Sequence, residues 1–363
     1  MTNRKVYHII SKQENGSAQV NTQMSENNQM SNNKRIDWID MAKGYGILLV
    51  IYAHLGVGAV GRWIYTFHIP LFFFLSGYVF STKYDFKTFA MRKFRSMILP
   101  YFALGIPMVL FQCLDEFVMG RFHEGTGVEL LANFLVQKRF WTLWYIACLF
   151  WLNMIFYWIV TGLKKMQYIL IVSMLMFCVG VAYYECGGKP WPWNVDVCLT
   201  AVVFFAVGYW FKNRYDRIRK CIDLRKSVGL FLVLGTVNVL CGFASYRLAG
   251  NGLDMYASSY GFPPLTFVSA FAGIFCVVIV AHWFTLSVTR YVGRNSLLFY
   301  AWHQTILIPV IDAVFAYLGV LKAGMPVWVN LGVRFLEMIV IVAILAVCNV
   351  IISHSKLKVM LGK

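Results

Sequence analysis

Residues 262–285 read FPPLTFVSAFAGIFCVVIVAHWFT and contain no Asp, Glu, Lys or Arg. A helix that crosses the hydrocarbon core of a bilayer needs about 20 apolar residues, and this run is long enough. Inside lipid, every backbone N–H and C=O group must be bonded within its own segment, so such a run is expected to be helical. Residues 262–285 therefore predict a membrane-spanning helix.

Similar apolar runs recur along the whole chain. Including the first, we expect ten spans, near residues 44–61, 64–81, 97–119, 140–161, 166–184, 195–212, 227–244, 262–285, 295–320 and 327–353. A membrane β-barrel would show shorter segments of alternating polarity. The pattern predicts an all-α, polytopic integral membrane protein that contacts the lipid bilayer over most of its surface.

The composition agrees with this class. Of the 363 residues, 59% are hydrophobic and only 13% are charged, whereas a soluble domain carries about 25% charged residues. This excludes a soluble globular enzyme and a disordered protein. The nine cysteines mostly fall inside apolar runs without the spacing of metal ligands, so we expect buried thiols and no metal site.

The excess of basic residues predicts the orientation of the chain. Of 33 Lys and Arg residues, 25 fall in the N-terminal stretch, the C-terminal tail and every second loop, seven fall in the opposite loops, and Arg334 lies in the last run. Cytoplasmic loops are enriched in Lys and Arg, so both termini are predicted to be cytoplasmic. The net charge of +17 is thereby explained, and no nucleic acid partner is expected.

The chain divides into two parts. Residues 1–33 are rich in Asn, Gln, Ser and Lys without apolar periodicity, which predicts a disordered cytoplasmic tail. Residues 34–363 form the transmembrane domain.

Ionisable groups at membrane depth are costly, so each is a candidate functional residue. Lys43 and His54 are eleven residues apart in the first run, which is roughly 16 Å along a helix and about three turns. They therefore share one face, with His54 near mid-membrane if Lys43 marks the cytoplasmic interface. His68 begins the next run after a short turn, which places it within a few turns of His54. For each histidine the alternative is a hydrogen-bonded packing role.

Arg92 and Arg95 are three residues apart and lie on one helical face if the third span begins early. Paired guanidinium groups suit bidentate binding of phosphate. On this evidence alone, a cluster that only sets topology is the simpler explanation.

These residues also form a recognisable series. The motifs are Asp37…Asp40-Met41-Ala42-Lys43-Gly44, His54, Phe67–Tyr78, Arg92-x-x-Arg95, Trp141–Tyr145, Phe204–Tyr209, Gly293–Leu297 and His303. The series spans about residues 35–310 and resembles the acyltransferase 3 family, nearest its fucose 4-O-acetylase-like branch. Many members of the family have Arg where this chain has Lys43, and Lys lacks the bidentate fork.

The resemblance implies a membrane O-acetyltransferase of the bacterial cytoplasmic membrane. It would take acetyl groups from cytoplasmic acetyl-CoA, as acyl donor, to a hydroxyl of an extracytoplasmic or lipid-linked glycan. Arg92, Arg95 and Lys43 are expected to bind the donor, although Lys43 could instead pair with an aspartate. His54 is expected to act as general base or transient acetyl acceptor, because a buried imidazole is held neutral. His68 is the second catalytic candidate.

Further residues are expected to bind the acceptor. They are Asp37, Asp40, Trp144, Asp196 and His303. For Asp196 two interpretations stay open: it stabilises a helix N-terminus, or it accepts hydrogen bonds from a sugar stacked on Trp191 and Trp193. His303 could equally be a packing residue. Arg334 and Glu337, three residues apart in the last run, are expected to pair.

Two other function classes fit a polytopic protein. A glycan exporter or transporter would move its substrate without acyl chemistry, but the sequence has no repeated halves. A sensor with a degenerate site would not need the histidine and the paired arginines. The candidate residues concentrate in the first 100 positions, which favours the enzyme.

The predicted orientation can be tested with reporter fusions. Fusions after residues 95 and 220 should report the cytoplasm, and fusions near residues 130 and 252 should report the outside. An exterior signal at residue 220 would overturn the orientation and, with it, the assignment of Arg92 and Arg95 to a cytoplasmic donor.

Overall fold

The computed structural model describes residues 36–137, 139–223 and 226–362. The predicted disordered tail, residues 1–33, lies outside the described residues.

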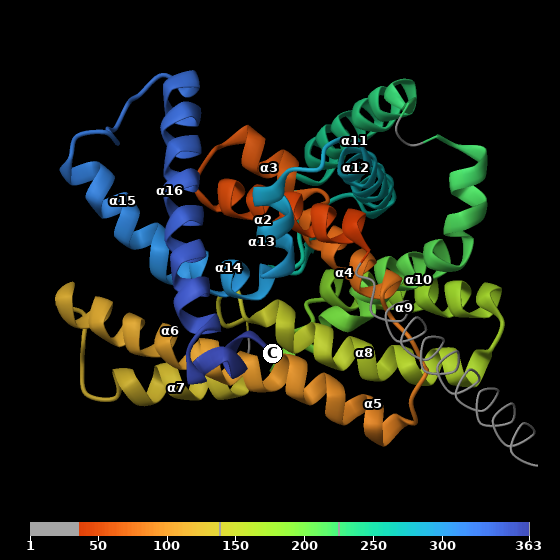
Figure 1. The fold of residues 1–363 in the computed structure, drawn as a ribbon, viewed down its shortest axis with the longest axis horizontal. Coiled ribbons are helices and arrows are strands. Elements are labelled where there is room, and N and C mark those ends of the chain that lie inside the picture. The colour runs from red at the N-terminus through yellow and green to blue at the C-terminus, as the bar shows by residue number, and fades with distance from the viewer. Residues whose placement is uncertain (1–35, 138, 224–225, 363) are drawn as a thin grey trace, which may run out of the picture.

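The described chain is helical apart from one short hairpin (Figure 1). The α-helices are α2 (Asp37–His54), α3 (Ala59–Tyr65), α4 (His68–Tyr78), α5 (Phe86–Lys93), α6 (Leu99–Val118), α7 (Thr126–Val136), α8 (Trp144–Leu163), α9 (Met166–Glu185), α10 (Val197–Cys221), α11 (Val228–Ala249), α12 (Pro263–Trp283), α13 (Ser287–Arg294), α14 (Ser296–Trp302), α15 (Ile308–Tyr317) and α16 (Val327–Ser353). Shorter helical segments are η1 (Phe94–Ile98), η2 (Pro192–Asn194), η4 (His303–Leu307) and η5 (Lys356–Leu361). Strands β1 (Leu253–Asp254) and β2 (Ser259–Tyr260) pair antiparallel, with Leu253 opposite Tyr260.

Within the described ranges, 8 helices are long and apolar enough to cross a membrane. They are Phe86–Val118, Trp144–Leu163, Met166–Glu185, Pro192–Cys221, Val228–Ala249, Pro263–Trp283, Ser296–Tyr317 and Val327–Ser353. Each matches one of the ten predicted runs. The protein is therefore an all-α, multi-pass membrane protein, in agreement with the composition.

The first two predicted runs fold differently from the other eight. Residues 44–61 and 64–81 become α2, α3 and α4, because Gly56 and Gly58 adopt positive φ and end α2 at His54. α4 has only 11 residues, about 16 Å of helix, which is short of the roughly 30 Å hydrocarbon core. The break between α2 and α4 leaves a histidine at the end of one helix and another at the start of the next.

The central helices pack closely through glycines. A Cβ on Gly77 of α4 would lie 1.9 Å from the Phe205 carbonyl oxygen of α10, and one on Gly208 of α10 would lie 1.9 Å from that of Phe74. Small residues allow helix backbones to approach in membranes. Gly77 therefore has a packing role, and this contact fixes α4, with His68 at its start, in the buried centre.

α2 is held in the same way against α13. A Cβ on Gly44 would lie 2.0 Å from the Thr289 carbonyl oxygen, and one on Gly293 would lie 1.8 Å from that of Asp40. In Figure 1, α2 and α13 lie near the centre of the view, between α16 on one side and α11 and α12 on the other, and α2 packs against α13, α12 and α16.

Two π-helical segments interrupt the spans. η1 precedes α6 and η4 precedes α15, and each following helix carries a proline, Pro100 or Pro309, at its second position. Because proline has no N–H to donate to the preceding turn, the helical register shifts there. Single-turn π segments are frequent at functional sites, and these two contain the predicted site residues Arg95 and His303.

The predicted pair in the last span is confirmed. Arg334 binds the Glu337 carboxylate at 2.7 Å and also contacts Asp312. The cysteines follow the prediction less closely: Cys148 and Cys198 are buried, whereas others on the outward faces of helices are exposed.

Candidate active site

Three histidines from separate parts of the chain meet in the interior. His54 ends α2, His68 begins α4 and His303 begins η4. The ring centroid of His54 lies 5.1 Å from that of His303 and 6.5 Å from that of His68. The structure thus brings together all three histidines that the sequence selected.

The hydrogen bonds of His54 determine which of its nitrogens is basic. Its Nδ1 lies 2.8 Å from the carbonyl oxygen of Val50, four residues earlier. A carbonyl oxygen can only accept, so Nδ1 carries the hydrogen and Nε2 of the neutral ring has the lone pair. The Tyr65 hydroxyl lies 3.3 Å from this Nε2 and donates to it. His54 therefore presents a basic nitrogen to a hydroxyl group already within reach.

His68 and His303 follow the same rule. Their Nδ1 atoms contact the carbonyl oxygens of Ile64 and Phe299 at 3.1 Å and 3.0 Å. The Nε2 atom of His303 is buried and has no hydrogen-bond partner among the described residues. Buried polar atoms are normally bonded to protein or water, so this nitrogen identifies a place where a ligand or water is expected.

A polar cavity of about 120 Å³ lies beside the cluster, and we call it the histidine cavity. Its walls include His54, His68, Trp144, Asp254 and Tyr300. Trp144, which the sequence predicted to bind substrate, thus lies on the same cavity as the two predicted catalytic histidines.

Asp254 and Tyr65 are the residues that sequence reasoning missed. Asp254 lies in the β1–β2 hairpin, and its Oδ1 accepts the backbone N–H groups of Tyr256 at 3.0 Å and Ala257 at 3.2 Å. The sequence offered one indication for Asp254: it lies in one of the few sizeable loops on the side opposite the loops rich in Lys and Arg. No motif marked either residue: Tyr65 contacts His54, and Asp254 lines the same cavity, only in the folded protein.

A buried ion pair anchors the loops around the cavity. The Arg139 guanidinium binds the Asp196 carboxylate at 2.7 Å, and the carboxylate is fully buried. Arg139 also donates to Asn194 at 2.8 Å and contacts Ser258, and the Tyr256 hydroxyl donates to its backbone carbonyl. The partners of Asp196 that the structure shows all belong to the protein, and its contact with a sugar stays a prediction.

Asp37 and Asp40 lie at the other end of α2. The Arg294 guanidinium binds Asp40 at 2.9 Å and Asp37 at 3.3 Å, and Arg290 lies 3.7 Å from Asp37. These arginines belong to α13, so the two aspartates join α2 to α13. They are not among the residues that line the histidine cavity.

A second cavity, of about 210 Å³, lies near this end of α2, and we call it the lysine cavity. Lys43, Ser76, Ser96, Tyr145 and Tyr300 are among its lining residues. Lys43 therefore faces a space that can hold a ligand, as its predicted role requires.

The paired arginines do not line the lysine cavity, although they lie close in the chain to its lining residue Ser96. Arg92 ends α5 and Arg95 lies in η1, directly before Ser96. Both are exposed, and the Arg92 guanidinium lies 4.5 Å from the centroid of the Tyr84 ring. The third span was predicted to begin near residue 97, but α5 already begins at Phe86, which meets the condition for a helical arrangement of the two arginines.

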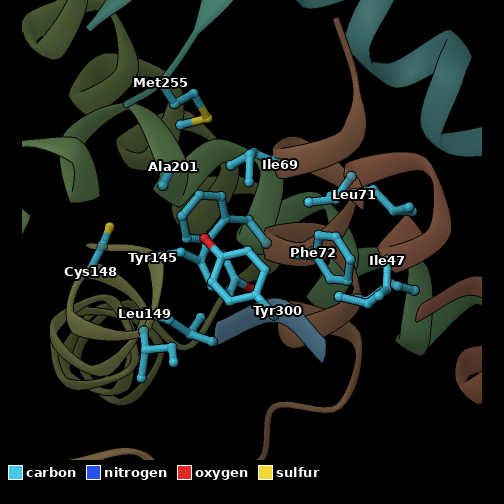
Figure 2. Packing of buried hydrophobic residues seen from close by; sticks show 14 of the residues in the cluster. Ile47, Ile69, Leu71, Phe72, Tyr145, Cys148, Leu149, Ala201, Met255 and Tyr300 are labelled. Carbon is cyan, nitrogen blue, oxygen red and sulfur yellow. The ribbon is translucent and has the colours of Figure 1, made fainter. Parts of the chain in front are cut away.

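Two tyrosines separate the two cavities. Tyr300 lines both of them, and its ring centroid lies 5.4 Å from that of Tyr145. Figure 2 shows the two rings side by side within the apolar core, near Phe72. The Tyr145 hydroxyl contacts Ser76 at 3.4 Å.

The comparisons with known proteins give one result. A family model described as an acyltransferase domain, of the acyltransferase 3 type, matches residues 36–354. No curated protein and no solved structure matches the chain. Among the described residues, no group of three or more His, Cys, Asp and Glu side chains could hold a metal ion.

Asp196 makes no side-chain capping bond to α10, so its structural role is the ion pair with Arg139, and this pair generates a prediction that separates that role from sugar recognition. Asp196→Asn leaves Arg139 buried without its carboxylate, and breaking a buried pair costs about 3–5 kcal/mol. Its Tm in detergent should fall by several degrees. Asp115→Asn, which disturbs the more exposed pair with Arg121, should cost at most about 1 kcal/mol and serves as the control.

If Asp196→Asn is as stable as Asp115→Asn but loses turnover of acceptor, the residue recognises substrate and the structural role is wrong.

Proposed function

Because the chain belongs to the acyltransferase 3 family, we propose that it is an O-acetyltransferase of the bacterial cytoplasmic membrane. It moves an acetyl group from cytoplasmic acetyl-CoA to a hydroxyl of an extracytoplasmic or lipid-linked glycan. The observation that carries this proposal is the pair of cavities that approach each other at Tyr300, one beside the histidines and one beside Lys43.

The lysine cavity suits the donor. Acetyl-CoA is a long molecule with several phosphates at one end and the thioester at the other. Arg92 and Arg95 are exposed and lie close in the chain to Ser96 of the cavity wall, where guanidinium groups can bind phosphate. Lys43, deeper along α2, adds a positive charge on the path of the pantetheine arm, and its ammonium acts as a point charge where a guanidinium would form a fork.

The distance between the two ends of α2 matches this arrangement. Lys43 and His54 are eleven positions apart, which is roughly 16 Å of helix. An extended acyl-pantetheine arm is long enough to span the distance from Lys43 to His54. Phosphates held on one side can therefore deliver a thioester to the tyrosine pair, next to the histidine cavity.

The histidine cavity suits the acceptor. Trp144 offers an aromatic face to a sugar ring, and Asp254 can accept hydrogen bonds from hydroxyl groups. A sugar hydroxyl that takes the place of the Tyr65 hydroxyl would donate to Nε2 of His54. General bases must lie within hydrogen-bond reach of the proton that they remove, and this geometry meets the condition.

The reaction then proceeds by direct transfer. The sugar oxygen attacks the thioester carbonyl carbon while Nε2 of His54 takes the hydroxyl proton. A new O–C bond forms, the C–S bond breaks, and the CoA sulfur leaves and takes up the proton, so that an O-acetyl ester and CoA thiol result. Nδ1 of His54 stays bonded to the Val50 carbonyl, which orients the ring and stabilises its protonated form during transfer.

The other two histidines support this step. His303, with its buried free Nε2, can accept a hydrogen bond from the acceptor or from a water in the site. His68 contacts Tyr65 edge to face, with ring centroids 4.6 Å apart, and so positions the tyrosine that touches His54.

Substitution of His54 tests the general base. His54→Ala and His54→Gln should both lose glycan acetylation by about 10²–10⁴-fold, because neither side chain exchanges a proton at neutral pH. Membrane insertion should be normal. His123→Gln, at an exposed loop position, is the matched control and should acetylate normally, as measured by mass spectrometry of surface glycans.

Near-normal acetylation by His54→Gln would assign His54 a packing role and move the base to His68 or His303. Loss of the surface glycan itself, rather than of its acetyl groups, would favour an exporter over an enzyme.

A further inference from the structure

Two further cavities lie near the histidine cavity. The first, of about 460 Å³, is the arginine cavity, with Arg62, Trp63, Arg247 and Leu253 among its lining residues. The second, of about 680 Å³, is the apolar groove, whose walls include Trp63. Leu253 also lines the histidine cavity. The arginine cavity therefore shares one wall residue with the histidine cavity and another with the apolar groove.

Arg62 and Arg247 distinguish the arginine cavity from the rest of the protein. Both are exposed, and they lie over the rings of Tyr246 and Phe243, at 5.7 Å and 5.0 Å from the ring centroids. Among the described residues, no carboxylate forms a salt bridge with either of them.

In the part of the chain that the structure describes, Arg121, Arg139, Arg290, Arg294 and Arg334 are paired with acidic groups, whereas Arg92, Arg95, Arg214, Arg217 and Arg219 form no salt bridge and do not line this cavity. Two guanidinium groups left without a carboxylate in one cavity form a site for an anion, and phosphate accepts from guanidinium in a bidentate manner.

The apolar groove has the character of a site for a hydrocarbon chain. It lies among α2, α11, α12 and α16, and its walls include Tyr52, Phe231, Phe335 and Met338. α11, α12 and α16 are all long enough to cross the membrane. Gly235 and Gly332 also line it, and a Cβ on either would meet nothing within 4 Å. In a bilayer such a space is filled by lipid.

We propose that the acceptor is an anionic lipid-linked sugar, in which a polyisoprenoid chain carries the sugar through a phosphate or pyrophosphate. The chain lies in the apolar groove, the phosphate lies between Arg62 and Arg247, and the sugar enters the histidine cavity past Leu253. This inference rests on the proposed function and narrows its acceptor to one class. A soluble glycan would use neither the groove nor the arginines, and an ordinary phospholipid would fill both without placing a sugar beside His54.

The test measures lipid binding directly. The full-length protein in detergent is titrated with decaprenyl phosphate, decaprenol, phosphatidylglycerol and inorganic phosphate, and complexes are counted by native mass spectrometry. Decaprenyl phosphate should bind more tightly than each of the other three. Arg62→Gln and Arg247→Gln should each weaken it by about 10-fold or more, the effect of losing one charged hydrogen bond.

Two further variants examine the groove. Gly235→Leu and Gly332→Leu place side chains into its open space and should weaken decaprenyl phosphate and decaprenol alike. The matched controls are Gly229→Leu, also in open space on α11 but not among the residues that line the groove, and Lys322→Gln, at an exposed position on the same predicted side. Both controls should bind decaprenyl phosphate as the unaltered protein does.

Equal binding of decaprenyl phosphate and phosphatidylglycerol, unaffected by the arginine variants, would overturn the proposal and indicate a general lipid surface. Binding of inorganic phosphate with the same affinity would overturn it in favour of a free-phosphate site. Acetyl-CoA binding is measured in the same preparations. If acetyl-CoA does not bind while decaprenyl phosphate still binds, this result contradicts the proposed acetyltransferase activity but not the lipid site.

Discussion

The candidate site depends on one repeated interaction, the hydrogen bond from a histidine Nδ1 to the carbonyl oxygen four residues earlier. His54, His68 and His303 all make it. Within a helix, that carbonyl oxygen would otherwise accept a hydrogen bond only from a backbone N–H group. The histidine side chain therefore bonds to an acceptor that the membrane segment already contains. The bond fixes the tautomer and turns each Nε2 toward the shared interior. In each of the three imidazole rings, Nδ1 is thereby hydrogen-bonded and Nε2 keeps its basic lone pair.

Close helix packing determines where those nitrogens point. The contacts of Gly44 with Thr289 and of Gly77 with Phe205 leave no room for a Cβ, so α2 and α4 are fixed against their neighbours at the backbone. α2 then carries Lys43 to one cavity and His54 to the other, and the tyrosine pair lies where the cavities meet. In the proposed reaction, the same helix therefore positions both the residue that binds the donor and the general base.

The sequence predicted the helical class, eight of the spans and the identity of the three histidines, because each rests on local features: apolar run length, or an ionisable group within such a run. The sequence contains Gly56 and Gly58 but does not itself show that the first two apolar runs break at these glycines. The positions of Tyr65 and Asp254 could not be read from the sequence, since Tyr65 contacts His54 across a turn and Asp254 comes to the same cavity on a distant hairpin. For Asp196, the residue type alone suggested a sugar ligand. Its partner Arg139 is 57 positions away in the chain, so only the folded structure shows the ion pair.

The central claim is that donor and acceptor enter from opposite ends of α2 and meet at Tyr300. The most direct measurement is a cryo-electron microscopy map of the protein with a non-hydrolysable acetyl-CoA analogue. The account predicts phosphate density beside Arg92 and Arg95, the pantetheine arm in the lysine cavity, and the acyl carbon at the Tyr145–Tyr300 pair, facing Nε2 of His54. Phosphate density between Arg62 and Arg247, with the lysine cavity empty, would contradict it.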